Sequence, residues 1–251
     1  MKSRRIAFCD LDDMLFQSRR KSDGDDLTPV VFQSNGKPIS FQTPAQRALF
    51  NMLAASTRLI PTTGRGTKWM QRVKLPFSDY AICSFGGVIL DRQGTPDSGW
   101  HHLISQQVVQ CNQGLTFYRD LVVAEAKRLS VDVRVNVAVD QGLELYVTVK
   151  HRHRVAEELA ELAKAVRLEL EHEWWMHVNG RNMTICPPFL GKEKAVAYFL
   201  SELAGPHDLV LGLGDSLSDV GFMSACDFAV SPINSQIFSS LSAEAAEQNG
   251  A

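Results

Sequence analysis

Short runs of mostly apolar residues recur near both ends of the chain, and each run ends in threonine, serine, glycine or aspartate. Polar positions do not alternate with apolar ones inside these runs, which is typical of strands buried on both faces. We expect such strands at Ile6–Cys9, Arg58–Thr62, Tyr80–Ser84 and Leu209–Leu213. Helical patterns from Pro44 to Leu53 and from Leu190 to Leu203 alternate with them. This order predicts an α/β fold whose parallel sheet is covered by helices on both faces.

A different pattern follows the first predicted strand. Residues Val30 to Phe41 form two apolar flanks around Asn35-Gly36, which is the turn chemistry of a β-hairpin. The tail from Ser239 to Ala251 is small and polar, so we expect it to fray.

The middle of the chain predicts an antiparallel sheet with helices on one side, inserted as a separate lobe. Its order is helix, strand, strand, helix, strand, strand. The expected elements are one or two helices within Trp100–Leu129, strands at Asp132–Val139 and Leu143–Val149, a helix at Arg152–Leu168, and strands at Glu173–Val178 and Met183–Cys186. We expect His151-Arg152-His153-Arg154 to lie at a solvated helix end, because alternate histidines do not have the i, i+4 spacing of metal ligands.

Composition narrows the class of protein. A chain of 251 residues with 45% hydrophobic residues fills a sizeable core. No apolar stretch approaches the ~20 residues that cross a bilayer, and the basic start runs straight into a strand, so we expect a cytoplasmic protein. Five scattered cysteines argue against disulfides and zinc. The net charge of -2 favours neither nucleic acid nor membrane as a partner.

Two carboxylates, Asp10 and Asp12, end the first strand at alternate positions. Every second side chain of an extended segment points the same way, so both acids can reach one pocket. The two negative charges repel each other unless a cation, a proton or a hydrogen-bond donor compensates them. The pattern therefore predicts either a metal site or an acid that transfers protons.

Other chemically active residues follow other predicted strands. Thr63, Gly64 and Arg65 come after the second strand, and Asp215 and Asp219 come after the last. Ligands of an open parallel sheet bind at the carboxyl ends of its strands, so we expect these segments to converge. Lys192 precedes the last strand by one helix and supplies a cation to the same edge.

These pieces, in this order, resemble the haloacid dehalogenase superfamily of aspartate-dependent phosphohydrolases. The motifs that carry the resemblance are Asp10-Leu11-Asp12, Thr63-Gly64-Arg65, Lys192 and Gly214-Asp215-Ser216-Leu217-Ser218-Asp219. They frame the whole chain, and the Asn-Gly hairpin looks like the flap of that family. The resemblance implies a Rossmann-like core at 1–85 and 187–251 with an inserted α+β cap at 86–186. That insertion point is similar to the sucrose-phosphate and trehalose-phosphate phosphatases and to phosphomannomutases.

By the same resemblance, Asp10 is the nucleophile and Asp12 the general acid and base. A magnesium ion takes oxygens from Asp10, Asp215 and the main-chain carbonyl of Asp12. Asp219 and Ser216 support this site from outside the ligand set. The phosphate is bound by Thr63, Gly64, Arg65 and Lys192, with main-chain N–H groups from Gly64 onward at a helix start.

The implied function is magnesium-dependent hydrolysis of a small phosphorylated metabolite, and the insertion point of the cap makes a sugar phosphate the expected class. Two alternatives stay open: a phosphomutase, and a non-catalytic module that binds phosphate or a partner. The sequence departs from the family at Asp13 and Met14, where a small residue and then threonine or valine are usual. Asp13 adds a third acid, although aspartate tolerates the left-handed backbone that such a turn requires.

Overall fold

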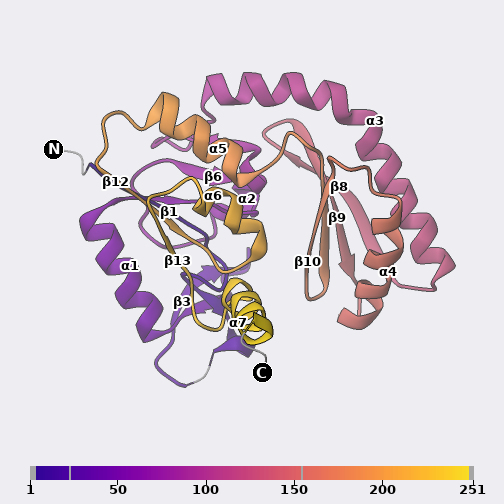
Figure 1. Ribbon diagram of the computed structural model, residues 1–251, viewed down its shortest axis with the longest axis horizontal. Coiled ribbons are helices and arrows are strands. Elements are labelled where there is room, and N and C mark those ends of the chain that lie inside the picture. The colour runs from indigo at the N-terminus through magenta and orange to yellow at the C-terminus, as the bar shows by residue number, and fades with distance from the viewer. Residues whose placement is uncertain (1–3, 23, 154, 249–251) are drawn as a thin grey trace. The chain divides into compact units, whose positions relative to one another are not determined.

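The computed structural model describes residues 4–22, 24–153 and 155–248. These residues form two compact units, one made of Met1–Trp100 and Gly191–Ala251 and the other of His101–Leu190. Each unit is built around its own sheet (Figure 1). In the described part of the chain, no helix combines the length and the apolar character needed to cross a membrane.

The first unit contains the predicted parallel sheet. Its strands are β1 (Arg5–Cys9), β5 (Arg58–Pro61), β12 (Leu209–Leu213) and β13 (Phe228–Val230), in the order β13-β12-β1-β5. Every neighbouring pair is parallel, and β1 pairs with β12 from Arg5↔Leu209 to Cys9↔Leu213. A parallel bridge from Thr62 to Ile82 attaches β6 (Ala81–Cys83) beyond β5. The predicted α/β class is confirmed.

Both faces of β1 are buried, as the uniform apolar pattern predicts. Ala7 and Cys9 join a core cluster with Phe50 of helix α1 (Pro44–Ser56). Phe8 points to the other face, where its ring meets that of Phe199 at 5.5 Å between centroids. Helix α1 begins at a capping box, in which Thr43 and Gln46 satisfy each other's main-chain N–H groups.

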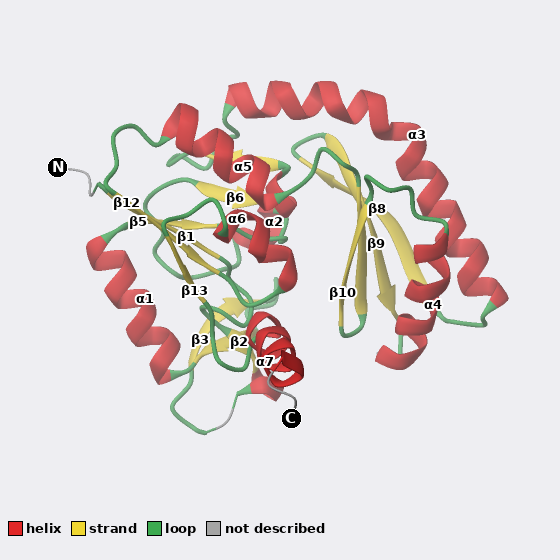
Figure 2. Cartoon of the chain, in the orientation of Figure 1, coloured by secondary structure: helices red, strands yellow, loops and turns green. Residues whose placement is uncertain are grey.

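The predicted Asn-Gly hairpin is also present. Strands β3 (Thr28–Phe32) and β4 (Pro38–Gln42) are antiparallel, and β2 (Gln17–Ser18) pairs with β4 on its other edge. Gly36 has a φ of 79° in the turn, a left-handed conformation that glycine adopts without steric strain. The sheet lies within the first unit (Figure 2).

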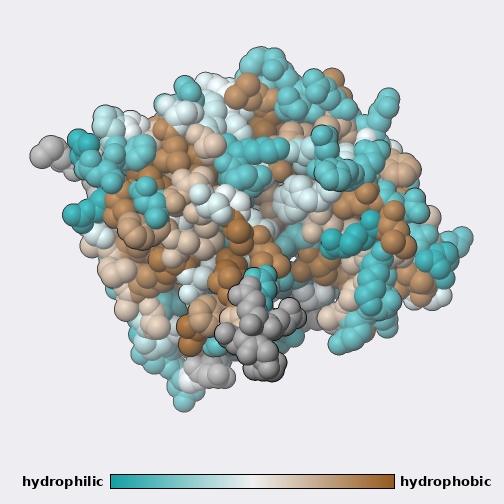
Figure 3. Space-filling model, in the orientation of Figure 1, coloured by the Kyte–Doolittle hydropathy of each residue, from teal (hydrophilic) through white to brown (hydrophobic). Residues whose placement is uncertain are grey.

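The second unit is a four-stranded antiparallel sheet with helices packed on it. Its strands are β8 (Val133–Asp140), β9 (Leu143–His151), β10 (Trp175–Asn179) and β11 (Asn182–Cys186), in the order β10-β11-β9-β8. Helices α3 (Ser98–Arg128) and α4 (Ala156–Leu168) share one core cluster with the strands. Figure 3 shows hydrophilic colour with scattered hydrophobic patches on the face of the molecule that includes these helices.

The start of α4 differs from the prediction. His151 ends β9 and is buried, so it does not lie at a solvated helix end. Its Nδ1 accepts hydrogen bonds from the N–H groups of His153 and Val155, at 3.2 and 3.3 Å. Its Nε2 lies 2.8 Å from a carboxylate oxygen of Glu158 on the helix. The ring therefore fixes the segment just before the helix, which begins four residues later than we expected, at Ala156.

The C-terminal tail also differs, because α7 (Gln236–Gln248) runs through most of the segment expected to fray. Ser235 stabilises its first turn by accepting the N–H of Phe238 at 2.9 Å. The N–H of Ile237 donates to the carbonyl of Asp215 at 3.2 Å, and Leu217 N–H donates to the side chain of Gln236. The helix is thus attached to the loop that carries Asp215. Residues 249–251 lie outside the described part.

The two units divide after Trp100, whereas the sequence suggested a boundary at residue 86. The intervening residues hold β7 (Val88–Leu90), which pairs antiparallel with β6. The indole N–H of Trp100 donates to the carbonyl of Gly86 at 2.8 Å. These bonds keep residues 86–100 with the first unit.

Candidate active site

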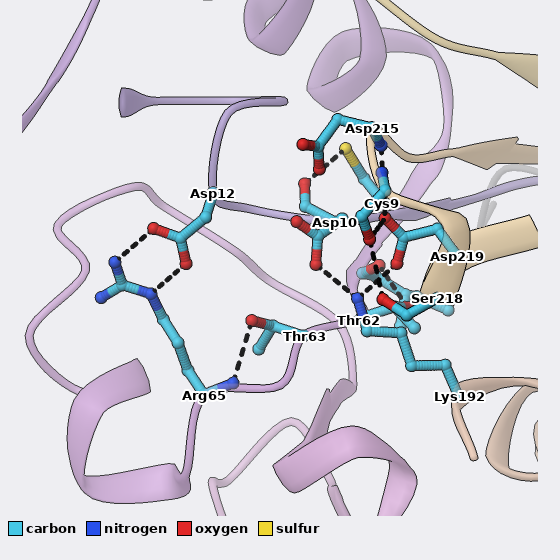
Figure 4. A network of polar contacts seen from close by, with 12 residues as sticks. Cys9, Asp10, Asp12, Thr62, Thr63, Arg65, Lys192, Asp215, Ser218 and Asp219 are labelled. Carbon is cyan, nitrogen blue, oxygen red and sulfur yellow. Dashed lines mark hydrogen bonds and ion pairs between the residues drawn. The ribbon is translucent and has the colours of Figure 1, made fainter. Parts of the chain in front are cut away.

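The two central strands of the sheet bring Asp10 and Asp215 together. Cys9 and Leu213 are register partners at the ends of β1 and β12, and the N–H of Asp10 donates to the carbonyl of Leu213 at 2.8 Å. Asp215 follows two residues after Leu213. Figure 4 shows both carboxylates on the same side of the strand ends.

Lys192 links two of the acids. It is the first residue of α5 (Lys192–Tyr198), and only 4% of its surface is exposed. Its Nζ donates to Asp10 Oδ1 and to Asp219 Oδ1, each at 2.6 Å. The ammonium group therefore sits between the predicted nucleophile and the acid at the far end of the last motif (Figure 4).

Asp219 is held from its other oxygen. Oδ2 accepts the N–H groups of Asp215 at 3.2 Å and Ser216 at 3.0 Å, and the Ser216 hydroxyl at 2.8 Å. Gly214 makes this close return of the chain feasible, because a Cβ there would lie 2.5 Å from the Cβ of Asp219. Ser216 thus supports the site by fixing Asp219.

The electrostatics of this group are unbalanced. Burial raises the pKa of Asp10 well above its usual range, and Lys192 offsets only part of this effect. Burial, Asp219 and Asp13 raise the pKa of Asp215 to about 7 against the attraction of Lys192 and Lys21. Burial also acts to raise the pKa of Asp219, but Lys192 and the Ser216 hydrogen bonds outweigh it and lower that pKa.

Three carboxylates share one ammonium group, so two negative charges lack a partner when all three acids are ionised. One carboxylate oxygen each from Asp10, Asp215 and Asp219 lies within 4.8 Å of the others. Hard oxygen ligands and a charge deficit of two fit a divalent ion such as Mg²⁺. The donor set therefore suits the predicted cofactor, and it includes Asp219, which we expected only in a supporting position.

Asp12 lies outside this cluster of three acids, because its side chain turns towards Arg65. Asp12 Oδ2 accepts from Arg65 Nε and Oδ1 from Nη2, both at 2.6 Å. Figure 4 shows the resulting fork separate from the Lys192 network. Burial alone acts to lower the pKa of Arg65, but the hydrogen bonds and charge of Asp12 raise it instead. The structure thus places Arg65 on the second acid and not beside Lys192.

Thr63 and Gly64 occupy the loop after β5. Thr63 is buried, and its Oγ1 accepts the N–H of Arg65 at 3.1 Å. A Cβ at Gly64 would lie 2.5 Å from the ring of Phe85, so the loop packs closely there. The helix expected to start at Gly64 begins only at Thr67 and is four residues long, as α2 (Thr67–Met70). Gly64 is therefore in a loop and not at a helix end.

Asp13 has the left-handed backbone expected of it, with a φ of 60°. Its carboxylate accepts a hydrogen bond from Lys21 Nζ at 2.5 Å. The pattern of the sequence contained no signal for Lys21 beyond its charge. Met14 is buried in the core, so the usual hydroxyl position is apolar in this chain.

Comparison with known proteins places this chain in a family. The family model of sucrose-6F-phosphate phosphohydrolase matches residues 42–247. No curated protein sequence gives a significant match.

Several solved structures share the fold. The sucrose-phosphatase from Synechocystis sp., in complex with sucrose and phosphate, matches with a TM-score of 0.52 and 16% identity, over 98% of each chain. The C-terminal domain of C. albicans trehalose-6-phosphate phosphatase matches with a TM-score of 0.52 and 15% identity, over 89% of this chain and 73% of that one. A haloacid dehalogenase-like hydrolase from B. subtilis matches with a TM-score of 0.53 and 13% identity, over 93% and 92%.

The resemblance found in the sequence motifs is confirmed, since the family model covers most of the chain and the fold neighbours agree with it. The chain belongs to the sucrose-6F-phosphate phosphohydrolase family, which consists of haloacid dehalogenase-type phosphatases that hydrolyse phosphate monoesters.

Proposed function

We propose that the protein is a magnesium-dependent phosphatase that hydrolyses a small phosphorylated metabolite through an aspartyl phosphate on Asp10. The observation that carries the proposal is the cluster of Asp10, Asp215 and Asp219, in which Lys192 bonds to Asp10 and to Asp219. Three carboxylates with one ammonium group among them leave a net negative charge at the end of the parallel sheet. This charge attracts a divalent cation, and the cation in turn attracts a phosphate.

Asp10 attacks phosphorus in the first half of the reaction. A bond forms between its Oδ and phosphorus, the bond from phosphorus to the leaving oxygen breaks, and the leaving oxygen takes a proton from the Asp12 carboxyl. Lys192 keeps Asp10 oriented through its 2.6 Å bond and places a positive charge beside the approaching phosphate. When bound by Asp10, Asp215 and Asp219, magnesium supplies the charge that screens the repulsion between carboxylate and phosphate.

Water completes the second half. Its oxygen bonds to phosphorus as the bond to Asp10 breaks, and its proton goes to the Asp12 carboxylate, which is then ready for another turnover. Inorganic phosphate leaves with the water oxygen. The loop residues Thr63 and Gly64 lie next to this edge and offer a hydroxyl and an N–H group to phosphate oxygens.

The substrate class that we propose is a sugar phosphate. The Synechocystis relative is a sucrose-phosphatase and the C. albicans one a trehalose-6-phosphate phosphatase, which supports this class without specifying the sugar. We propose that the unit His101–Leu190 is the cap that contacts the leaving group. Proteins that share a fold differ in substrate because of the residues added to that fold, and here the added residues form this unit.

A panel of sugar phosphates, with release of inorganic phosphate as the readout, tests the proposal. Asp10→Asn should abolish turnover, because the amide is a far weaker nucleophile, and Asp12→Ala should lower it by about 10²–10⁴-fold. Chelation of divalent cations should stop the reaction and added Mg²⁺ should restore it. Turnover by Asp10→Asn would refute the nucleophile assignment. Isomerisation of the substrate, dependent on a trace of bisphosphate and without phosphate release, would favour the phosphomutase alternative.

A further inference from the structure

Arg65 and Asp12 form a fork in which each carboxylate oxygen accepts a hydrogen bond from one guanidinium nitrogen, with an N to O distance of 2.6 Å in both bonds. Such a pair fixes the plane of the carboxylate as well as its distance, which a single ammonium contact does not do. The Arg65 side chain is 17% exposed and that of Asp12 is 48% exposed. Arg65 is therefore the less exposed of the two partners.

The same turn of the chain holds both partners of the fork. The Arg65 guanidinium lies over the Phe16 ring, 5.1 Å from its centroid, and Phe16 is fully buried. Phe16 also forms a β-bridge with Asp12, and its carbonyl accepts the N–H of Asp13 at 2.7 Å. The N–H of Arg65 is tied to Thr63. Each partner is thus fixed by bonds that do not involve the fork itself.

We propose that Arg65 is a positioning residue for Asp12 and not a ligand of the substrate phosphate. It fixes the plane from which the Asp12 carboxyl gives its proton to the leaving oxygen and later takes one from water. The proposal rests on the acid and base role of Asp12 in the proposed function. Two guanidinium nitrogens already point at Asp12, so the fork has to open before they reach a phosphate oxygen.

The two roles differ in how a loss depends on the leaving group. An alkoxide leaves phosphorus only with a proton, whereas a nitrophenolate leaves without one. A residue that positions the proton donor therefore affects alkyl esters much more than aryl esters. A residue that binds the phosphate affects both alike, and it also affects the affinity for inorganic phosphate.

Arg65→Lys and Arg65→Gln, assayed with a hexose phosphate and with p-nitrophenyl phosphate, separate these roles. We expect kcat/KM for the hexose phosphate, which reports the step that expels the leaving group, to fall about 10–100-fold in both variants, since a positioned acid contributes about 10²–10⁴-fold. We expect kcat/KM for the aryl ester to change by about threefold or less, and inhibition by inorganic phosphate to stay the same. Lysine keeps the charge but not the fork, so it should not rescue alkyl turnover.

Equal losses of kcat/KM on both esters would overturn the proposal, and so would unchanged kcat/KM for both. In an Asp12→Asn background, Arg65→Lys should cause no further loss on the alkyl ester, because the two residues act as one unit. Arg47→Lys is the matched control, since Arg47 Nη2 pairs with both oxygens of Asp26 at 3.1 and 2.9 Å. If the wild-type protein turns over neither ester, the proposed function itself fails, whereas an active wild type with the wrong pattern refutes only the role of Arg65.

Discussion

Asp215 carries a carboxyl group that the fold holds in an unfavourable state. Its pKa rises from 3.8 to about 7, chiefly through burial and the charge of Asp219. Between these values the folded protein holds a proton that the unfolded chain has lost. The free energy of unfolding of the metal-free protein therefore falls as the pH rises from about 4 to about 7. Each unit of this shift corresponds to about 1.4 kcal/mol, so the contribution amounts to a few kcal/mol.

Asp215→Asn should therefore stabilise the metal-free protein while it removes activity. We expect the free energy of unfolding at pH 8 to rise by about 2 kcal/mol, because asparagine removes the cost of an ionised carboxylate at this position in the folded protein. At pH 4 the gain should vanish, since Asp215 is then protonated in the folded state. Urea titrations at the two pH values measure this difference. A variant less stable than wild type at pH 8 would contradict the assignment.

Lys21 and Asp13 form a second charge pair beside the site. Lys21→Ala leaves the Asp13 carboxylate uncompensated near the phosphate, so KM for a phosphorylated substrate should rise several-fold at low salt and less at high salt. Steady-state kinetics at two ionic strengths measure this effect.

The double variant Lys21→Ala with Asp13→Asn removes both charges and should return KM close to the wild-type value. A KM that stays high in the double variant would show instead that Lys21 contacts the substrate itself.

The close approach of elements at the strand end depends on Gly214. A methyl group there would meet Asp219 Cβ at 2.5 Å, and Met223 Sδ of helix α6 (Val220–Met223) at 2.8 Å. Gly214→Ala should lower the free energy of unfolding by about 1–3 kcal/mol through overpacking. It should also lower kcat, because Asp219 moves away from Lys192.

Thermal unfolding together with phosphate release measures both effects. Gly221→Ala is the matched control, since the nearest atom to its added methyl is the flexible end of Glu193 at 3.3 Å. Equal activity in the two variants would argue against a role for Gly214 in placing Asp219.

Elements were predictable from the sequence where a general rule governs them. Apolar strands implied a parallel sheet, and the edge rule brought Asp10 next to Asp215. The partner of Arg65 was not predictable, because it depends on the turn after β1, where Leu15 and Phe16 donate N–H groups back to the carbonyl of Leu11. The conformation of such a turn cannot be predicted from composition. Helix α7 was missed for a similar reason, since its anchor is a contact with the distant Asp215 loop.

At the scale of the whole molecule, the chain has two separate cores, so we expect a bound metal ion to stabilise only one of them against unfolding. The three acids belong to the first unit, and none lies within His101–Leu190. Binding to the folded state alone stabilises it by about 2.7 kcal/mol at a hundred times Kd. For a chain of this size, that corresponds to a rise in Tm of about 5–11 °C.

Hydrogen exchange with Mg²⁺ should slow in strands β1 and β12 and remain unchanged in β8 and β9. Asp215→Asn should abolish the slowing, and sodium chloride at equal ionic strength should not produce it. Protection spread evenly over both units, or absent from β1, would place the metal elsewhere than among Asp10, Asp215 and Asp219.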